Sequence, residues 1–259
     1  MIDIWQEIYG TIKRNKLRTL LTGFAVAWGI FMLIVLLGAG NGLIHAFEKS
    51  SSARALNSIK IYPGWTGKPY DGLKEGRRIQ LDNKDLDATM EHFSDNIISV
   101  GASQWQSNVN LSYGQEYVNL SLEGVYPNFT EVESVKSTDG RFINDIDLKE
   151  RRKVIVLHTK TAEILFGKSK TEPIGKFVNA GGVSYQVVGL YTDPGDQGSS
   201  EAYIPFSTLQ VIYNKGDKLN NLTFTTKGLT TIETNEAFEA AYRKVMGAKH
   251  RFDSSDNSA

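Results

Sequence analysis

The sequence predicts an α+β protein in which one N-terminal transmembrane helix is followed by a two-lobed extracytoplasmic domain. Three observations support this prediction: a long uncharged apolar segment near the N-terminus, a basic cluster directly before it, and a polar remainder that mixes helical and strand periodicities. The chain has 259 residues, with 29 basic and 29 acidic side chains and 41% hydrophobic residues. These totals are ordinary for a folded globular chain, so the apolar segment is a local exception.

The apolar segment covers residues 19–44 and includes the run "LLTGFAVAWGIFMLIVLLGAGNGL". It carries no ionisable side chain between Arg18 and His45. As a helix it would be roughly 39 Å long, whereas about 20 residues are enough to cross the hydrocarbon core. A buried helix of a soluble protein is disfavoured because the segment is apolar all round. A cleaved signal peptide is disfavoured because its apolar core normally has about 7–15 residues.

The charges beside this segment predict its orientation. Four basic side chains precede it closely, namely Lys13, Arg14, Lys16 and Arg18. The positive-inside rule places residues 1–18 in the cytoplasm and residues from about 46 onward outside. Trp5 lies on an apolar stripe of residues 1–18, so we expect a short helix at the membrane interface with Trp5 as an anchor; a disordered tail is the alternative. Gly23 and Gly29 are candidate helix-packing positions, although their spacing is not the four-residue repeat.

The region after the span reads as alternating strands and helices. "SIKIYPG" predicts a short strand, and residues 82–93 predict a helix with Asp82 as its N-cap. A half-buried hairpin is expected around the turn at Tyr113–Gly114. Its alternation puts Val118, Leu120 and Leu122 on one face, and Asn119, Ser121 and Glu123 on the other.

A strand-to-helix rhythm follows this hairpin. We expect a buried strand over Val154–Leu157, a helix that ends at Gly167, a hairpin that turns at Gly181–Gly182, and a strand and helix joined at Pro205. The last unit is the strand "LTFTT" and an amphipathic helix. The face of that helix is formed by Phe238, Ala241, Tyr242 and Val245.

These elements are predicted to form two lobes. One lobe comprises residues 46–125 and 215–250, and the other, residues 126–214, is inserted between them. Residues 251–259 are polar and are expected to be a linker. Two loops rich in Gly, Pro and aromatic residues are candidate partner-binding sites. Their candidate residues are Trp65, Tyr70, Tyr191, Pro194 and Gly195.

The sequence offers no catalytic constellation, and we predict no catalytic, cofactor-binding or metal-binding residue. There is no cysteine, and the four histidines are scattered. The equal acid and base counts give no support to nucleic-acid binding. "AEILFGKSKT" approaches a P-loop, but Ala162 replaces its first glycine and the stretch before Gly167 has helical periodicity. Asp145 and Asp147 lie in a turn-like context, where helix capping is the expected role.

Several motifs in this chain occur in a familiar order. They begin with "NKLRTLLTGFAVAWGI" before and within the span and continue with "LEGVYPNF", "DGRFINDID", "RRKVIVLHTKTAEILFG", "PIGKFV", "YQVVGLYTDPG" and "AYIPFSTL". Seven matches over nearly the whole chain resemble permease subunits of the MacB/FtsX type of ABC transporter.

The resemblance implies a subunit of the bacterial inner membrane that works as a homodimer or paired permease. A cytoplasmic ABC ATPase would drive it, and a periplasmic adaptor protein is a further expected partner. The two lobes would be a porter-like lobe and an inserted Sabre-like lobe, which transmit ATP-driven movement to export or release of substrate. The family has four membrane helices, so we expect this chain to be a fragment whose residues 251–259 lead toward a second helix.

Two alternatives remain open at this point. A single-span sensor or binding domain would need a ligand pocket and a cytoplasmic signalling module, for which residues 1–18 are too short. An anchored extracytoplasmic enzyme would need a catalytic cluster, which the sequence does not show.

Overall fold

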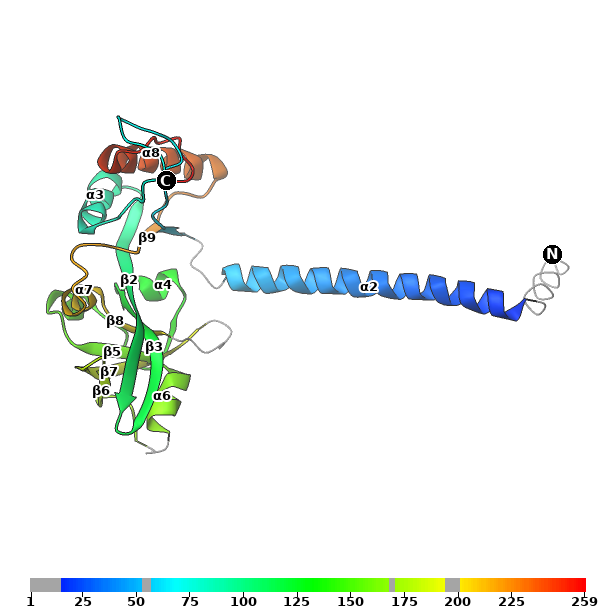
Figure 1. Cartoon of the computed structure of the whole chain (residues 1–259), viewed down its shortest axis with the longest axis horizontal. Helices are drawn as coiled ribbons and strands as arrows, with labels where there is room; N and C mark the ends of the chain where they lie inside the picture. The colour runs from blue at the N-terminus through cyan, green and yellow to red at the C-terminus, as the bar shows by residue number, and fades with distance from the viewer. Residues whose placement is uncertain (1–14, 53–56, 168–170, 194–200) are drawn as a thin grey trace. The chain divides into compact units, whose positions relative to one another are not determined.

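The computed structural model describes residues 15–52, 57–167, 171–193 and 201–259 (Figure 1). The chain divides into two compact units, Met1–Ser52 and Ala53–Ala259, which are described separately below. The second unit is called the body. Trp5, Lys13 and Arg14 lie outside the described residues, and so does the predicted interfacial helix around Trp5.

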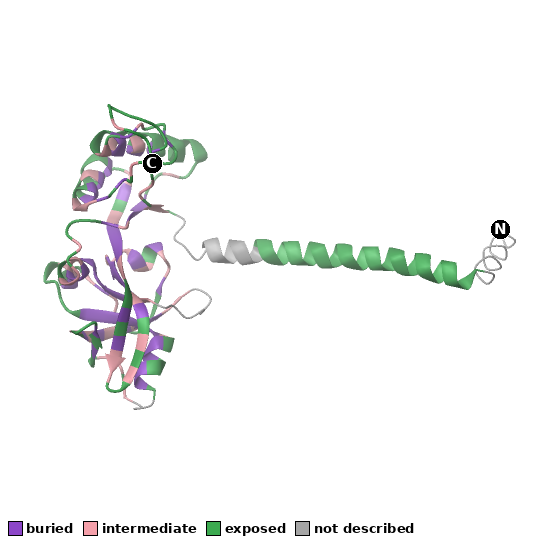
Figure 2. Ribbon diagram, in the orientation of Figure 1, coloured by how far each residue is buried: buried purple, intermediate pink, exposed green. Residues whose placement is uncertain are grey.

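The first unit contains one long helix, α2 (Lys16–Ser52). Its part from Lys16 to Ile44 is long and apolar enough to cross a membrane, and none of that part is buried within the chain (Figure 2). The hydroxyl groups of Thr19 and Thr22 donate to the carbonyl oxygens of Asn15 and Arg18, at 3.2 and 2.9 Å. These bonds satisfy polar groups that would find no water in the hydrocarbon core.

The body begins with a small antiparallel sheet made of β1 (Ser58–Ile61), β9 (Asn221–Thr226) and the first half of β2 (Ile97–Tyr113). Helices α3 (Asn83–Phe93) and α8 (Ile232–His250) supply apolar side chains to the core on one face of this sheet. That core includes Phe238, whose ring lies 5.3 Å from that of Phe93 and 5.9 Å from that of Phe224.

The second half of β2 belongs to a closed ring of six strands. The ring runs from β2 through β3 (Glu116–Val125), β8 (Glu201–Pro205), β5 (Val154–His158), β7 (Val183–Thr192) and β6 (Phe177–Ala180), and β6 pairs again with β2. Strand β4 (Lys136–Gly140) pairs with β7 outside the ring. A sheet that closes on itself leaves no unpaired edge, so this part of the body is a small barrel.

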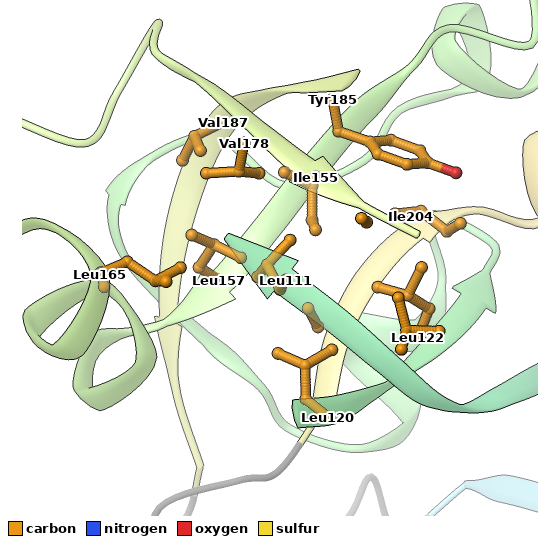
Figure 3. Packing of buried hydrophobic residues seen from close by; sticks show 14 of the residues in the cluster. Leu111, Leu120, Leu122, Ile155, Leu157, Leu165, Val178, Tyr185, Val187 and Ile204 are labelled. Carbon is orange, nitrogen blue, oxygen red and sulfur yellow. The ribbon is translucent and has the colours of Figure 1, made fainter. Parts of the chain in front are cut away.

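The barrel interior is filled by aliphatic side chains from every strand of the ring (Figure 3). Leu111, Leu122, Ile155 and Val187 are completely buried there. Helices α6 (Thr159–Phe166) and α7 (Phe206–Ile212) complete this core with Leu165, Phe166 and Leu209.

A third apolar cluster covers part of the outer surface of the barrel. Short helix α4 (Phe129–Val132) contributes Phe129, and strand β8 contributes Tyr203, whose ring lies 4.9 Å from that of Phe129. Helix α5 (Asp145–Lys149) begins with a capping box in which Asn144 and Asp147 each accept from the other's backbone N–H. The predicted capping role of Asp147 is therefore confirmed.

The strands and helices predicted for the body are present, and the fold class is confirmed. Ala241 is an exception on α8, because it is exposed while Phe238 and Tyr242 are buried. Glu123 on β3 is a second exception. The alternation of the hairpin predicts that it lies on the polar face, but it is buried in the structure.

The division into two lobes stays a prediction, because the body forms one compact unit. Its apolar clusters nevertheless place Val109 and Leu111 of β2, and Leu120 and Leu122 of β3, in the barrel core. This grouping differs from the predicted boundary at residue 125.

Candidate functional site

The candidate membrane residues that the structure describes all lie on α2. Lys16 and Arg18 are exposed in its first turn. A Cβ added at Gly23 or Gly29 would meet no atom within 4 Å, so both glycines offer an open surface to another membrane helix. Their role in helix packing stays a prediction.

The first candidate partner loop is exposed, as expected. The Trp65 loop, residues 62–78, carries Tyr62, Trp65 and Tyr70 with 58%, 60% and 41% of their surface exposed. Two hydrogen bonds between Tyr70 and Leu73 close a tight turn at its tip, at 3.0 and 2.8 Å. The aromatic side chains are therefore presented on an ordered loop.

Residues 251–259, here called the C-terminal strap, hold the base of this loop. Asp256 is almost fully buried, and its carboxylate accepts from the backbone N–H groups of Gly67 and Lys68 at 2.6 and 3.1 Å. The N–H of Trp65 donates to the carbonyl oxygen of Ser258 at 3.0 Å. Burial raises the pKa of Asp256, but the backbone donors outweigh it, and the net pKa is lowered.

The role of residues 251–259 as a linker toward a second membrane helix stays a prediction, but in the structure these residues pack against the Trp65 loop. The strap lies so close to the loop that a Cβ at Gly64 would come within 2.1 Å of the Ser258 carbonyl oxygen. Phe252 joins the core beneath α8. One sequence signal was available, because a lone phenylalanine in a polar tail needs a place to be buried.

The second candidate loop is corrected at Tyr191. Tyr191 is completely buried on β7, and its hydroxyl donates to the carbonyl oxygen of Glu201 at 3.0 Å. Its ring lies 4.6 Å from that of Tyr203. Tyr191 is a core residue because strand β7 continues through it to Thr192. Pro194 and Gly195 lie outside the described residues.

A charged seam, which the sequence did not predict, lies where the small sheet meets the barrel. Lys60 on β1 forms an ion pair with Glu133 at 2.6 Å, and Glu123 lies nearby on β3 with 3% of its surface exposed. Burial raises the pKa of the Glu123 carboxyl from 4.5 to about 7, and the negative charge of Glu201 acts in the same direction. The Ser103 hydroxyl and Lys60 oppose this rise.

A second buried carboxylate fastens α8 to α3. Asp85 accepts from the backbone N–H of Asp82 at 2.7 Å, and it pairs with Lys249 at 2.6 Å and His250 at 2.8 Å. Burial raises the pKa of Asp85, but these partners outweigh it, so its pKa is lowered. Asp85 therefore has a structural role, because it holds α8 against α3.

The near-P-loop sequence does not form a phosphate-binding turn in the described residues. Residues 159–166 are helical, and Gly167 is the C-cap of that helix. Within the described ranges, no group of three or more His, Cys, Asp or Glu side chains could hold a metal ion.

Comparison with known proteins identifies the family that shares this architecture. The model of the MacB-like periplasmic core domain matches residues 19–241, from the apolar helix to within α8. The macrolide export ATP-binding/permease protein MacB of Wolinella succinogenes is 28% identical over 214 residues. That alignment covers 80% of this chain and 32% of the relative. MacB of Bordetella avium is 25% identical over 245 residues, covering 92% of this chain and 36% of that protein.

Solved structures show the same fold. The periplasmic region of MacB from Actinobacillus actinomycetemcomitans has a TM-score of 0.62 at 19% identity, covering 78% of this chain and 87% of that chain. The extracellular domain of the noncanonic ABC-type transporter YknZ from Gram-positive bacteria also has a TM-score of 0.62, at 23% identity, covering 77% of this chain and 97% of that chain.

This chain spans about a third of the length of the relatives it matches. The family match extends over most of the chain, from the transmembrane helix through both the small sheet and the barrel. The chain therefore belongs to the MacB-like periplasmic core domain family and has the features of a MacB-type ABC transporter permease component.

Proposed function

We propose that this chain forms the first membrane helix and the extracytoplasmic body of a permease that transmits ATP-driven movement to substrate export or release. The observation that carries the proposal is the family match over residues 19–241, which includes both the span and most of the body. In this arrangement the basic side chains before the span lie in the cytoplasm and the body lies in the periplasm.

The role of the body is mechanical rather than catalytic in this proposal. The names of its relatives combine an ATP-binding part with a permease part, and this chain aligns with about a third of their length. ATP hydrolysis is therefore assigned to a cytoplasmic ABC ATPase. The permease would act as a homodimer or as one of a pair, with a periplasmic adaptor as a further partner.

The connectivity of the sheet supports a mechanical role. Strand β2 has 17 residues, and its first half pairs with β9 while its second half pairs with β3. Ile97 and Ala102 lie in the core of the small sheet, whereas Val109 and Leu111 lie in the barrel core. We propose that these two cores correspond to the porter-like and Sabre-like lobes, with their boundary within β2.

The orientation can be tested with single cysteines, because the natural chain has none. Lys16→Cys and Tyr117→Cys place one thiol before the span and one on an exposed strand of the body. In spheroplasts, a membrane-impermeant maleimide should label Tyr117→Cys, and should label Lys16→Cys only after lysis. The opposite labelling pattern would overturn the orientation.

Movement can be tested in the complete transporter that contains this chain. A spin label at Tyr117, on the exposed part of the barrel, reports the distance between two copies. We expect the distance distribution to shift between the nucleotide-free and ATP-bound states. An unchanged distribution in an assembly that hydrolyses ATP would refute mechanical transmission by the body.

A further inference from the structure

The charged seam belongs to a larger polar layer on the face of the small sheet that points away from α3 and α8. Residues that pair directly across neighbouring strands point to the same face of a sheet. Ala102 and Leu222 of the opposite face lie in the apolar core. The polar layer comprises Lys60, Thr223, Ser103, Asn221 and Glu123. All but Lys60 have 3% or less of their surface exposed.

Residues 126–133, here called the covering segment, lie over this face and include α4. A Cβ at Gly101 would overlap Asn128 Oδ1, so the segment approaches the sheet closely there. The ion pair between Lys60 and Glu133, at 2.6 Å, joins the end of the segment to the sheet. The polar layer is therefore covered by a short segment that one ion pair helps to hold.

Several polar atoms beneath the covering segment have no hydrogen-bond partner in the part of the chain that the structure describes. They are Ser103 Oγ, Glu123 Oε1, Asn128 Oδ1 and both polar atoms of the Asn221 amide. Three of these five atoms are oxygens that can only accept when Glu123 is ionised, so the layer is then short of donors. Buried polar atoms without partners destabilise the packed state.

Glu123 is the deeply buried titratable group of this layer. It pairs in register with Trp105 on β2 and with Tyr203 on β8. The ring of Tyr203 lies 4.9 Å from that of Phe129 in the covering segment. Burial raises the pKa of Tyr203, so its hydroxyl stays protonated. The contacts of the covering segment therefore extend to the neighbour of Glu123.

The charges that face Glu123 come from β8 and β1. Glu201 on β8 disfavours a negative charge at Glu123, and Lys60 on β1 favours it. Lys60 is already paired with Glu133, and among the described residues no ion pair involves Glu123 itself. The Ser103 hydroxyl lowers the pKa of Glu123 as a nearby dipole, although its geometry is not that of a hydrogen bond. A covered Glu123 therefore has little to stabilise its ionised form.

We propose that Glu123 is a pH-sensitive latch for the covering segment. A protonated Glu123 supplies a donor that the polar layer lacks and keeps the segment packed on the sheet. An ionised Glu123 requires hydration, so the segment opens locally and water reaches the layer. The latch therefore loosens as the pH rises. It is a property of the body alone and goes beyond the transport role proposed above.

Glu201 is a second carboxylate that could titrate in the same range, because burial and the nearby Asp193 raise its pKa. Glu201 is only partly buried, whereas Glu123 has 3% of its surface exposed. Hydration on opening therefore changes more at Glu123, and the latch is assigned to that residue. The experiment below compares the two carboxylates directly.

The latch can be tested by hydrogen exchange of the whole chain in lipid nanodiscs between pH 5 and pH 8, corrected for the intrinsic effect of pH. The reporting amides are those of Glu131, Val132 and Glu133, which donate to carbonyl oxygens within the covering segment. The reference amides are those of β5, whose residues are all buried. We expect the reporting amides to exchange faster than the reference amides, through a local opening. This opening should become roughly 50-fold more frequent from pH 5 to pH 8, as a pKa that changes from about 7 to 4.5 on opening predicts.

Three variants separate the latch from other sources of pH dependence. Glu123→Gln keeps the size of the side chain, and local exchange should no longer depend on pH. Glu201→Gln should keep an increase of at least about tenfold, because Glu123 still titrates. Glu131→Gln removes an exposed carboxylate on α4 itself and is the matched control, which should behave as the wild type.

Local exchange that does not change with pH in the wild type overturns the latch, and so does exchange of the reporting amides at the rate of the β5 amides. A pH dependence that Glu123→Gln keeps, or that Glu201→Gln abolishes, also overturns it. Thermal unfolding identifies any variant that does not fold. If Glu123→Gln is unfolded, ¹³C-labelled glutamate carboxyls are titrated by NMR in Glu201→Gln. One carboxyl should then titrate near 7, and titration of all of them near 4.5 overturns the proposal.

Discussion

The two sheet regions of the body differ in how their strands pair and in how completely their cores are filled. The barrel closes through β6, and its interior residues, such as Leu111 and Ile155, have no exposed surface. Among the described residues, the small sheet of β1, β9 and β2 does not close into a ring, and all four residues of β1 are only partly buried. Beside β1 lies a cavity of about 430 Å³.

The contrast shows which region is the more completely packed. A closed barrel satisfies every backbone group with its own strands and fills its interior with its own side chains. The barrel therefore contributes mainly to the stability of the body. The small sheet leaves a cavity between β1 and α8, so the interface between this sheet and its helix is less completely filled.

The largest expected effect compares matched truncations in the two regions. Ile155→Ala in the barrel should lower the free energy of unfolding by about 4 kcal/mol, because a rigid core cannot fill the cavity. Ile59→Ala beside the cavity should cost only about 1 kcal/mol, since that side chain is only partly buried. Urea denaturation of the whole chain in detergent micelles measures both. Equal losses would contradict the contrast between a filled core and an underfilled one.

The seam between the regions should make stability depend on pH through Glu123. The folded carboxyl titrates near 7 and the unfolded one near 4.5, so between these values the folded chain binds more protons. Stability should therefore fall as the pH rises from about 4.5 to about 7, by about 3 kcal/mol.

Glu123→Gln keeps the size of the side chain and removes its charge. The variant should be more stable than the wild type at pH 8 and nearly equal to it at pH 4.5. Denaturation at several pH values provides the measurement. A wild-type and variant difference that does not change with pH would show that Glu123 remains ionised when folded.

On helix α3, which packs against the small sheet, Asp85→Asn should lower the free energy of unfolding by about 2 kcal/mol, because Lys249 and His250 lose a charged partner. The pKa of Asp85 is lowered in the folded chain, so its stabilisation is present above the unfolded pKa and is lost as the pH falls through the folded pKa. The cost of the substitution should therefore shrink in acid. Comparing Asp87→Asn, a neighbouring exposed carboxylate on α3, controls for a general change in helix charge.

The smallest effect is expected at the strap. In Gly64→Ala the new methyl group would overlap the carbonyl oxygen of Ser258 and displace residues 251–259. We expect a loss of about 1 kcal/mol. Hydrogen exchange should show faster exchange of the Trp65, Gly67 and Lys68 amides. Lys74→Ala, an exposed change in the same loop, should leave this exchange as it is.

Much of the fold followed from the sequence, because periodicity over several residues reports burial directly. The uncharged span, the strand at Val154–Leu157 and the turn at Gly181–Gly182 each depend on neighbouring residues alone. The hydrophobic pattern also predicted Phe238 and Tyr242 as buried. Such features need no knowledge of which strands become neighbours.

What the sequence could not show depends on contacts between distant segments. Glu123 alternates with Asn119 and Ser121, and only the pairing of β3 with β8 reveals that it is covered. Tyr191 resembled the start of an aromatic loop, yet its hydroxyl meets a carbonyl ten residues away. The strap and the cavity required the same kind of information, since both form between segments more than 150 residues apart.

The single strand β2 has a consequence for any force applied to the body. At about 3.3 Å per residue, the 17 residues of β2 form one strand roughly 56 Å long, and its side chains contribute to both cores. The strand has two register shifts: one against β9, between Ile97 and Ser99, and one against β3, between Gln106 and Val109, where Asn108 adopts a positive φ of 58°. The second irregularity lies between the residues of the two cores. Under load this irregularity is where the body should bend first, so the small sheet and the barrel would tilt about it while each keeps its internal shape.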